Sequence, residues 1–152
     1  MEPLNILLVE DNPDHAELII ETLLDFNVGN KIIHLENGEA ALTHLNSLEE
    51  TEKPPQLILM DIKMPRMNGI ETLKVLKKSD RFKHVPVIMI TTSSNRKEVD
   101  MCFAEGAASY ISKPLKFDDF AKKIKDLAMV RGAIQSCMGI IDSGYTTTDP
   151  EE

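Results

Sequence analysis

A chain of 152 residues with 42% hydrophobic and 28% charged residues can bury the core of one domain without disulfides. Its formal net charge of −8 argues against attraction to nucleic acid or to an anionic membrane, and no apolar run approaches the roughly 20 residues that span a bilayer. The N-terminus lacks signal-peptide features, and Cys102 and Cys137 are too few for a disulfide framework or a metal clip. We therefore expect a cytoplasmic protein with free thiols.

Five short apolar runs have the length and the flanking turn residues of strands that are buried in a sheet. The clearest are residues 57–60, which end in Asp61, and residues 87–90, which end in Thr91. The predicted strands are 6–9, 31–35, 57–61, 87–90 and 109–112.

Segments of helical periodicity follow these runs. Asn12 can cap a first helix that opens at Pro13, and we expect Gly29-Asn30 to break the chain after it. Gly106 is expected to stop the fourth helix. The residues expected on the buried faces are Ala16, Ile19, Ile20, Leu23 and Leu24 in the first helix, Ala41, Leu42, Leu45 and Leu48 in the second, Ile70, Leu73 and Leu76 in the third, Val99, Cys102 and Phe103 in the fourth, and Phe117, Phe120, Ala121, Ile124, Leu127 and Ala128 in the fifth.

This fivefold alternation of strand and helix predicts the fold class. Short connections between the elements favour a parallel sheet with helices on both faces and right-handed crossovers. We expect an α/β fold built as a three-layer sandwich. The periodicity does not supply the order of the strands.

Four of the five runs end in polar residues that can do chemistry: Glu10 and Asp11, Asp61, Thr91 and Lys113. Each has an ordinary explanation alone, because Asp11 can cap a helix, Thr91 can satisfy a turn and an isolated lysine is usually solvated. In a parallel sheet, however, the carboxyl ends of the strands share one edge, where ligands bind. We therefore expect these side chains to form one site.

Three carboxylates at one edge repel one another unless a cation lies among them. Oxygen ligands suit a hard ion such as Mg²⁺, whereas zinc is not expected because His15, His34, His44 and His84 do not accompany the strand ends. A carboxylate kept ionised in this way can attack phosphorus and form an aspartyl phosphate. Mg²⁺ and the Lys113 ammonium would neutralise charge on the phosphoryl oxygens, and the Thr91 hydroxyl would donate a hydrogen bond.

These residues also resemble a known family. Glu10-Asp11, Asp61 with Met64-Pro65 and Asn68-Gly69, Thr91, and Tyr110 three residues before Lys113-Pro114 are similar to the receiver domains of bacterial response regulators, of the CheY-like type. The similarity runs from about residue 6 to about residue 129. It implies a flavodoxin-like fold with strand order 2-1-3-4-5.

The resemblance also implies roles for individual residues. Asp61 would accept a phosphoryl group from a histidine kinase or a phosphotransfer protein, and Thr91 and Lys113 would contact that group. Mg²⁺ would be held by Glu10, Asp11, Asp61 and the backbone carbonyl of Lys63. Thr91 would move toward the phosphate and Tyr110 would fill the vacated space, so that partners could read the change. The Lys113-Pro114 peptide bond is expected to be cis.

We expect a receiver domain over residues 4–131 and an extension over residues 132–152, with no output domain. An apolar stripe would continue the last helix to about residue 141, although two glycines leave a frayed tail as an alternative, and the remainder would be disordered. The chain is thus similar to stand-alone receivers and to the small regulators paired with bacterial phytochromes. The last two helices and the extension would bind a downstream protein or a second copy of the chain.

Two other functions compete with this interpretation. A phosphatase-like hydrolase would need a second acid or base near Asp61, and a scaffold that works without phosphorylation would not need the acidic set. Neither enzyme activity on external substrates nor binding to nucleic acid or membrane is expected. The lysines of the third helix region, Lys74, Lys77, Lys78 and Lys83, are expected to form a solvated face.

Overall fold

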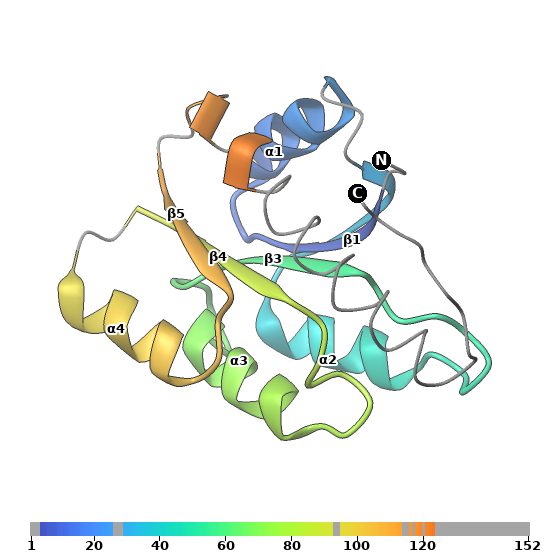
Figure 1. Cartoon of the computed structure of the whole chain (residues 1–152). Coiled ribbons are helices and arrows are strands. Elements are labelled where there is room, and N and C mark those ends of the chain that lie inside the picture. The colour runs from blue at the N-terminus through green and yellow to red at the C-terminus, as the bar shows by residue number, and fades with distance from the viewer. Residues whose placement is uncertain are drawn as a thin grey trace, which may run out of the picture.

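The computed structural model describes residues 4–25, 29–92, 95–113, 116, 118–119 and 121–123. Strands and helices alternate along the chain (Figure 1). They are β1 (Leu4–Val9), α1 (Pro13–Asp25), β2 (Gly29–Leu35), α2 (Gly38–Asn46), β3 (Leu57–Asp61), α3 (Gly69–Lys78), β4 (Val87–Thr91), α4 (Arg96–Ala104) and β5 (Ser109–Ser112).

The strands form one parallel sheet in the order β2-β1-β3-β4-β5. In Figure 1, α1 lies on one face of this sheet and α2, α3 and α4 lie on the other. Both the three-layer α/β sandwich predicted from alternation and the strand order 2-1-3-4-5 implied by the resemblance are confirmed.

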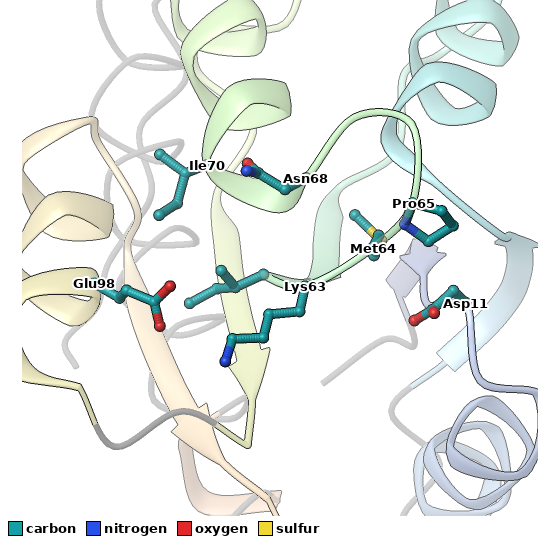
Figure 2. Close-up of a pocket in the computed structure, with 8 residues that line it drawn as sticks. Asp11, Lys63, Met64, Pro65, Asn68, Ile70 and Glu98 are labelled. Carbon is teal, nitrogen blue, oxygen red and sulfur yellow. The ribbon is translucent and has the colours of Figure 1, made fainter.

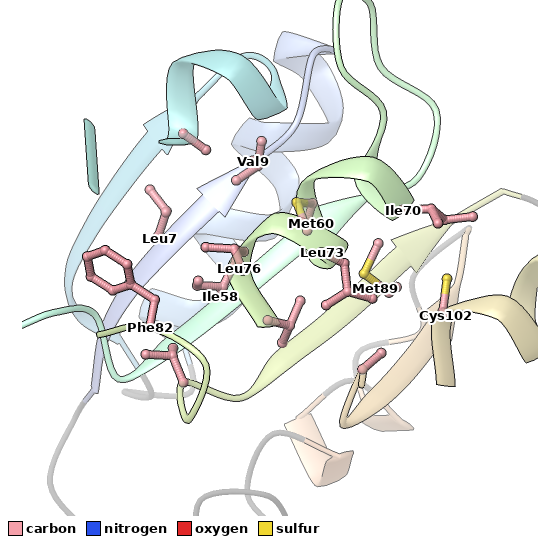
Figure 3. Packing of buried hydrophobic residues seen from close by; sticks show 14 of the residues in the cluster. Leu7, Val9, Ile58, Met60, Ile70, Leu73, Leu76, Phe82, Met89 and Cys102 are labelled. Carbon is pink, nitrogen blue, oxygen red and sulfur yellow. The ribbon is translucent and has the colours of Figure 1, made fainter. Parts of the chain in front are cut away.

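Each face of the sheet has its own apolar core. Side chains alternate across a strand, so Leu7 and Val9 of β1 pack under α2–α4, whereas Ile6 and Leu8 pack under α1. Figure 3 shows the first of these cores. Every residue of β3 and β4 is buried, as expected for central strands covered on both faces. The central strands therefore give the residues at their ends a rigid base.

Asparagine side chains start four of the helices, as the sequence indicates for the first. Asn12 Oδ1 accepts hydrogen bonds from the backbone N–H groups of Asp14 and His15 at the start of α1. Asn37 and Asn95 cap α2 and α4 in a similar way, and Asn68 forms a capping box with Glu71 at α3. Several of these caps follow directly on strand ends, so they hold the loops of the site edge.

The structure corrects three expectations about exposure. Leu24 is 57% exposed and Phe103 is 46% exposed, although both were expected on buried faces. Each is the residue next to a buried one, and one step along a helix turns the side chain by about 100°, out of the buried stripe. Lys77 is half-buried rather than solvated, because its Nζ donates to the carbonyl oxygens of Lys83 and Val85.

The first helix ends before Gly29-Asn30, as expected, but the strand expected over residues 31–35 begins two residues earlier. These residues open β2, where Gly29 lies opposite Leu4 and the register shifts by one residue before Asn5 pairs with Lys31. A glycine fits such an irregularity in the pairing because it has no side chain to pack.

Some predictions concern residues outside those described. They are the cis Lys113-Pro114 bond, the positions of Phe117, Phe120, Ile124, Leu127, Ala128 and Cys137, and the helix and tail of residues 132–152. The described residues 118–119 and 121–123 are helical, and Ala121 is buried. Among the described helices, none has the length and apolar character needed to cross a membrane.

Candidate functional site

The carboxyl ends of β1, β3, β4 and β5 meet at one edge of the sheet. Glu10 and Asp11 follow β1, Asp61 ends β3, Thr91 ends β4 and Lys113 follows β5. The parallel register places these residues side by side, because Asp61 pairs with Ile90 and Thr91 pairs with Ser112. The edge therefore gathers acids, a hydroxyl and an ammonium from four distant segments.

The Lys113 ammonium lies among the acids. Its Nζ is 2.6 Å from Glu10 Oε1, 3.2 Å from Asp61 Oδ2 and 3.0 Å from His15 Nδ1. The lysine side chain is only 7% exposed, so it is nearly withdrawn from water. Buried charges are tolerated when they are paired and hydrogen-bonded, and this ammonium is both.

The two oxygens of Asp61 are held differently. Oδ1 accepts a hydrogen bond of 2.8 Å from the backbone N–H of Ile62, whereas Oδ2 accepts one from Lys113. The residue is only 8% exposed, but it is the last residue of β3, so its carboxylate lies at the carboxyl edge of the sheet. This arrangement fixes the rotation of the carboxylate and leaves Oδ2 beside the cation.

Glu10 is more deeply buried than Asp61, and this burial disfavours its ionised form. Burial raises the pKa of the Glu10 carboxyl, and the charge of Asp61 raises it further. Hydrogen bonds from Lys113 and from the backbone N–H of Asn12 act in the opposite direction without cancelling the shift. The ionised form of Glu10 is therefore less favourable in the folded protein than in water, although Lys113 donates to it.

Glu10, Asp11 and Asp61 together form a group that can hold a metal ion. One oxygen of each lies within 4.8 Å of the others, and Asp11 is the exposed member of the three. A donor set made only of carboxylate oxygens fits a hard divalent cation. A divalent cation would also favour the ionised form of Glu10, which burial disfavours.

The loop from β3 to α3 forms one wall of the site. Gly69 N–H donates to the Ile62 carbonyl at 2.7 Å, and a Cβ on Gly69 would stand only 2.1 Å from the Asp61 carbonyl oxygen. Arg66 has a positive φ of 70°, which lets the loop turn tightly. The start of α3 is thus pressed against the end of β3, which holds Asp61 in place.

An open groove of about 430 Å³ runs beside the acids. Figure 2 shows Asp11 on one side of it and Glu98 on the other, with Lys63 between them in this view. The lining residues are Asp11, Ile62, Lys63, Met64, Pro65, Asn68, Ile70 and Glu98. Of the three grouped acids, Asp11 lines this groove.

Thr91 and Tyr110, expected to work as a pair, lie in different surroundings. Thr91 is fully buried, and its carbonyl accepts a hydrogen bond of 2.7 Å from Lys113 N–H, which joins the ends of β4 and β5. Tyr110 of β5 is partly exposed and meets Phe103 edge-on, with ring centroids 6.2 Å apart. Lys123 Nζ lies 5.3 Å from the centre of the tyrosine ring. The tyrosine thus faces α4 and the segment after β5.

The structure also corrects the expectation about histidines. His15 Nδ1 contacts Lys113 Nζ, and His34 Nε2 donates to the Glu10 carbonyl at 2.8 Å, so two histidines do accompany the strand ends. Among the described residues, the group that could hold a metal consists of carboxylates alone. Zinc is therefore still not expected, but because the ligands are carboxylates and not because histidines are distant. The position of His15 in the first turn of α1, directly after the β1 acids, was the available signal.

Residues 6–125 match the family model of the response regulator receiver domain. The chain belongs to this family. It is 33% identical over 127 residues to the probable methanogenesis regulatory protein FilR2 of Methanothrix harundinacea, covering 83% of this chain and 82% of FilR2. The receiver family was the one that the motifs resembled, so that prediction is confirmed.

Solved structures of receivers have the same fold. The bacteriophytochrome response regulator AtBRR is 33% identical, with a TM-score of 0.71 over 84% of this chain and 94% of AtBRR. The Mn²⁺-bound form of the response regulator Rcp1, a protein of Synechocystis, is 29% identical, with a TM-score of 0.69 over 98% of this chain and all of that one. These neighbours include regulators of the phytochrome-associated kind.

Proposed function

We propose that this chain is a single-domain response regulator of a two-component phosphorelay, with Asp61 as phosphoacceptor. The observation that carries the proposal is the Lys113 ammonium between Glu10 and Asp61, beside three carboxylates with oxygens within 4.8 Å. Membership of the receiver family supports it. The reaction is confined to phosphorylation and dephosphorylation of its own Asp61, so the chain is not an enzyme acting on external substrates.

Asp61 Oδ2 is the attacking oxygen in this proposal, because it lies beside the Lys113 ammonium that would contact the phosphoryl oxygens, whereas Oδ1 is held by Ile62 N–H. A bond forms between Oδ2 and phosphorus while the bond from phosphorus to the donor's imidazole nitrogen breaks, and the bonding pair stays on that nitrogen. Lys113 then donates to a phosphoryl oxygen in place of Oδ2. The hydroxyl of Thr91 supplies a further hydrogen bond, so that the transferred group meets fixed donors.

The metal of this site is Mg²⁺ in our proposal. Glu10, Asp11 and Asp61 would hold it together with the backbone carbonyl of Lys63, which lines the adjacent groove. When bound, Mg²⁺ neutralises charge on the phosphoryl oxygens and keeps the acids ionised. The Mn²⁺-bound form of Rcp1 supports binding of a divalent cation, and the oxygen-only ligand set of this chain favours Mg²⁺.

The phosphoryl donor is a sensor histidine kinase, and the similarity to bacteriophytochrome response regulators favours a kinase of the phytochrome type. Phosphorylation adds charge at the rim and draws Thr91 toward it, and Tyr110 repacks in response. The altered surface binds a downstream protein or a second copy of the chain through the last two helices and the extension. We expect these events in the cytoplasm, with no role for nucleic acid or membrane.

The test is labelling of the chain by acetyl phosphate in the presence of Mg²⁺. Wild-type protein is expected to form an acid-stable, hydroxylamine-labile phosphate, and Asp61→Asn is expected to form none while keeping the circular dichroism spectrum of the wild type. Asp80→Asn is a matched control, because it removes one exposed carboxylate from the loop after α3. Labelling of Asp61→Asn at the wild-type rate, or labelling without Mg²⁺, would refute the assignment.

A further inference from the structure

The ammonium of Lys113 uses all three of its N–H donors in the structure. Two of the acceptors are carboxylate oxygens, from Glu10 and Asp61, and the third is the imidazole nitrogen Nδ1 of His15 at 3.0 Å. A lysine ammonium donates three hydrogen bonds and accepts none. The direction of the third contact is therefore fixed: Lys113 donates and His15 accepts.

This direction determines the protonation of His15. A ring nitrogen that accepts a hydrogen bond carries no proton, so this contact requires the tautomer with its proton on Nε2. A protonated ring would place two cations within 3.0 Å of each other. The fold thus presents a neutral acceptor to the lysine, next to two charged ones.

The cap of α1 holds the backbone of His15 in position. Asn12 Oδ1 caps α1 by accepting hydrogen bonds from the N–H groups of Asp14 and His15, at 2.9 Å and 3.2 Å. His15 is partly buried in the first turn of α1, whose next residue, Ala16, is buried against the sheet. The helix cap therefore fixes the backbone that carries the ring, and the contact with Lys113 Nζ fixes the ring itself.

The next step rests on the proposed function. During phosphoryl transfer, one of the three hydrogen bonds of Lys113 is replaced and the other two are kept. When Asp61 Oδ2 becomes bonded to phosphorus, its hydrogen bond from Lys113 is replaced by one from Lys113 to the phosphoryl oxygens. The contacts with Glu10 and His15 are not consumed by the reaction, so they can hold the ammonium before and after transfer. The contact with Glu10 competes with its role toward a metal, whereas the contact with His15 does not.

We propose that His15 is a positioning residue for phosphoryl transfer, which orients the Lys113 ammonium toward the phosphoryl group by accepting its third hydrogen bond at Nδ1. A hydrogen bond from a charged donor, when removed, costs enough to change a rate by about tenfold. The loss is expected in the maximal rate constant of labelling. The concentration of phosphodonor at half-maximal rate should change little, because His15 acts through the lysine.

Two variants of His15 separate a hydrogen-bonding role from a packing role. His15→Leu fills the same space without an acceptor and is expected to lower the maximal labelling rate about tenfold. His15→Asn keeps an acceptor near the position of Nδ1 and is expected to restore most of that rate. His84→Leu is the matched control, because His84 is exposed and precedes β4 at the opposite end of the strands. Equal rates in His15→Leu and the wild type, or equal losses in the Leu and Asn variants, would overturn the inference.

A spectroscopic readout tests the same contact without any phosphodonor. ¹⁵N NMR of the wild type in its neutral form should show His15 protonated at Nε2 and not at Nδ1, and the Lys113 Nζ signal should shift in His15→Leu but not in His84→Leu. A proton on His15 Nδ1 would overturn the inference and leave Asp61 labelling, the core of the proposed function, intact. Absence of label on wild-type Asp61 would overturn both.

Discussion

Glu10 shows how a single buried acid can set the behaviour of the site. Its pKa is raised chiefly by burial, so the ionised form is less favourable in the folded protein than in the unfolded chain. Such a shift makes a contribution to stability that is complete below the ordinary pKa of 4.5 and is lost as pH rises through the raised value. Folding therefore disfavours the ionised form of Glu10, and positive charge near its carboxylate favours that form.

Glu10→Gln should remove this unfavourable ionisation. In the presence of EDTA we expect its free energy of unfolding to match that of the wild type at low pH, where Glu10 is protonated, and to exceed it increasingly as pH rises. Urea denaturation followed by circular dichroism across pH measures the difference. Glu17→Gln is the control, because Glu17 is exposed on α1. A difference independent of pH would show that burial does not destabilise the ionised form of Glu10.

At the same scale, the sequence located most but not all of the site. Glu10, Asp11, Asp61, Thr91 and Lys113 were found because each stands where a short apolar run stops, and the edge of a parallel sheet collects such residues. His15 was missed because its partner is 98 residues away, and a hydrogen bond of this range leaves no periodic pattern. The roles implied for Lys63 and Tyr110 came from the family resemblance and stay predictions.

Among the elements, the junction of β3 with α3 constrains the site most. The Cβ of an alanine at position 69 would lie 2.1 Å from the Asp61 carbonyl oxygen and 2.9 Å from Ile62 Cα, and both are backbone atoms that cannot rotate away. The helix start and the strand end would have to separate. This explains the glycine on packing grounds and links the position of α3 to that of Asp61.

Gly69→Ala should therefore reduce both stability and phosphorylation. Forcing the junction apart is expected to lower the free energy of unfolding by about 1–3 kcal/mol, and the displaced Asp61 should be labelled more slowly by acetyl phosphate. Thermal denaturation and the labelling rate are measured together. Lys74→Ala on the exposed face of α3 controls for changes in helix propensity. Loss of stability with an unchanged labelling rate would mean that the junction does not position Asp61.

Element types were predictable because apolar runs and helical stripes are local signals. The limits of the buried stripes were not, since Leu24 and Phe103 each continue an apolar pattern one residue too far round the helix. Lys77 was misplaced because a lysine stem can lie along the protein while its ammonium reaches carbonyl groups of the loop before β4. The exposure of these side chains depends on how the elements pack together, which a local sequence pattern does not contain.

At the scale of the whole molecule, the site exists only when the sheet and its two apolar cores are folded. Asp61 ends β3, while Glu10 and Asp11 follow the neighbouring strand β1. The grouping of their oxygens therefore depends on the folded sheet. A cation that binds the folded state alone must stabilise that state by mass action. The strand order needed for this convergence came from the family resemblance, because periodicity does not order strands.

The last prediction concerns this linkage. Mg²⁺ at about 100 times its dissociation constant should stabilise the protein by about 2.7 kcal/mol, which raises the melting temperature by several degrees. Asp11→Asn should abolish most of that rise at the same Mg²⁺ concentration while leaving the melting temperature in EDTA nearly unchanged, because Asp11 is the exposed acid and Lys113 is held by Glu10 and Asp61. Differential scanning calorimetry with Mg²⁺ and with EDTA makes the comparison, and Asp14→Asn on the exposed start of α1 is the control. An equal Mg²⁺-induced rise in Asp11→Asn and the wild type would place the cation elsewhere.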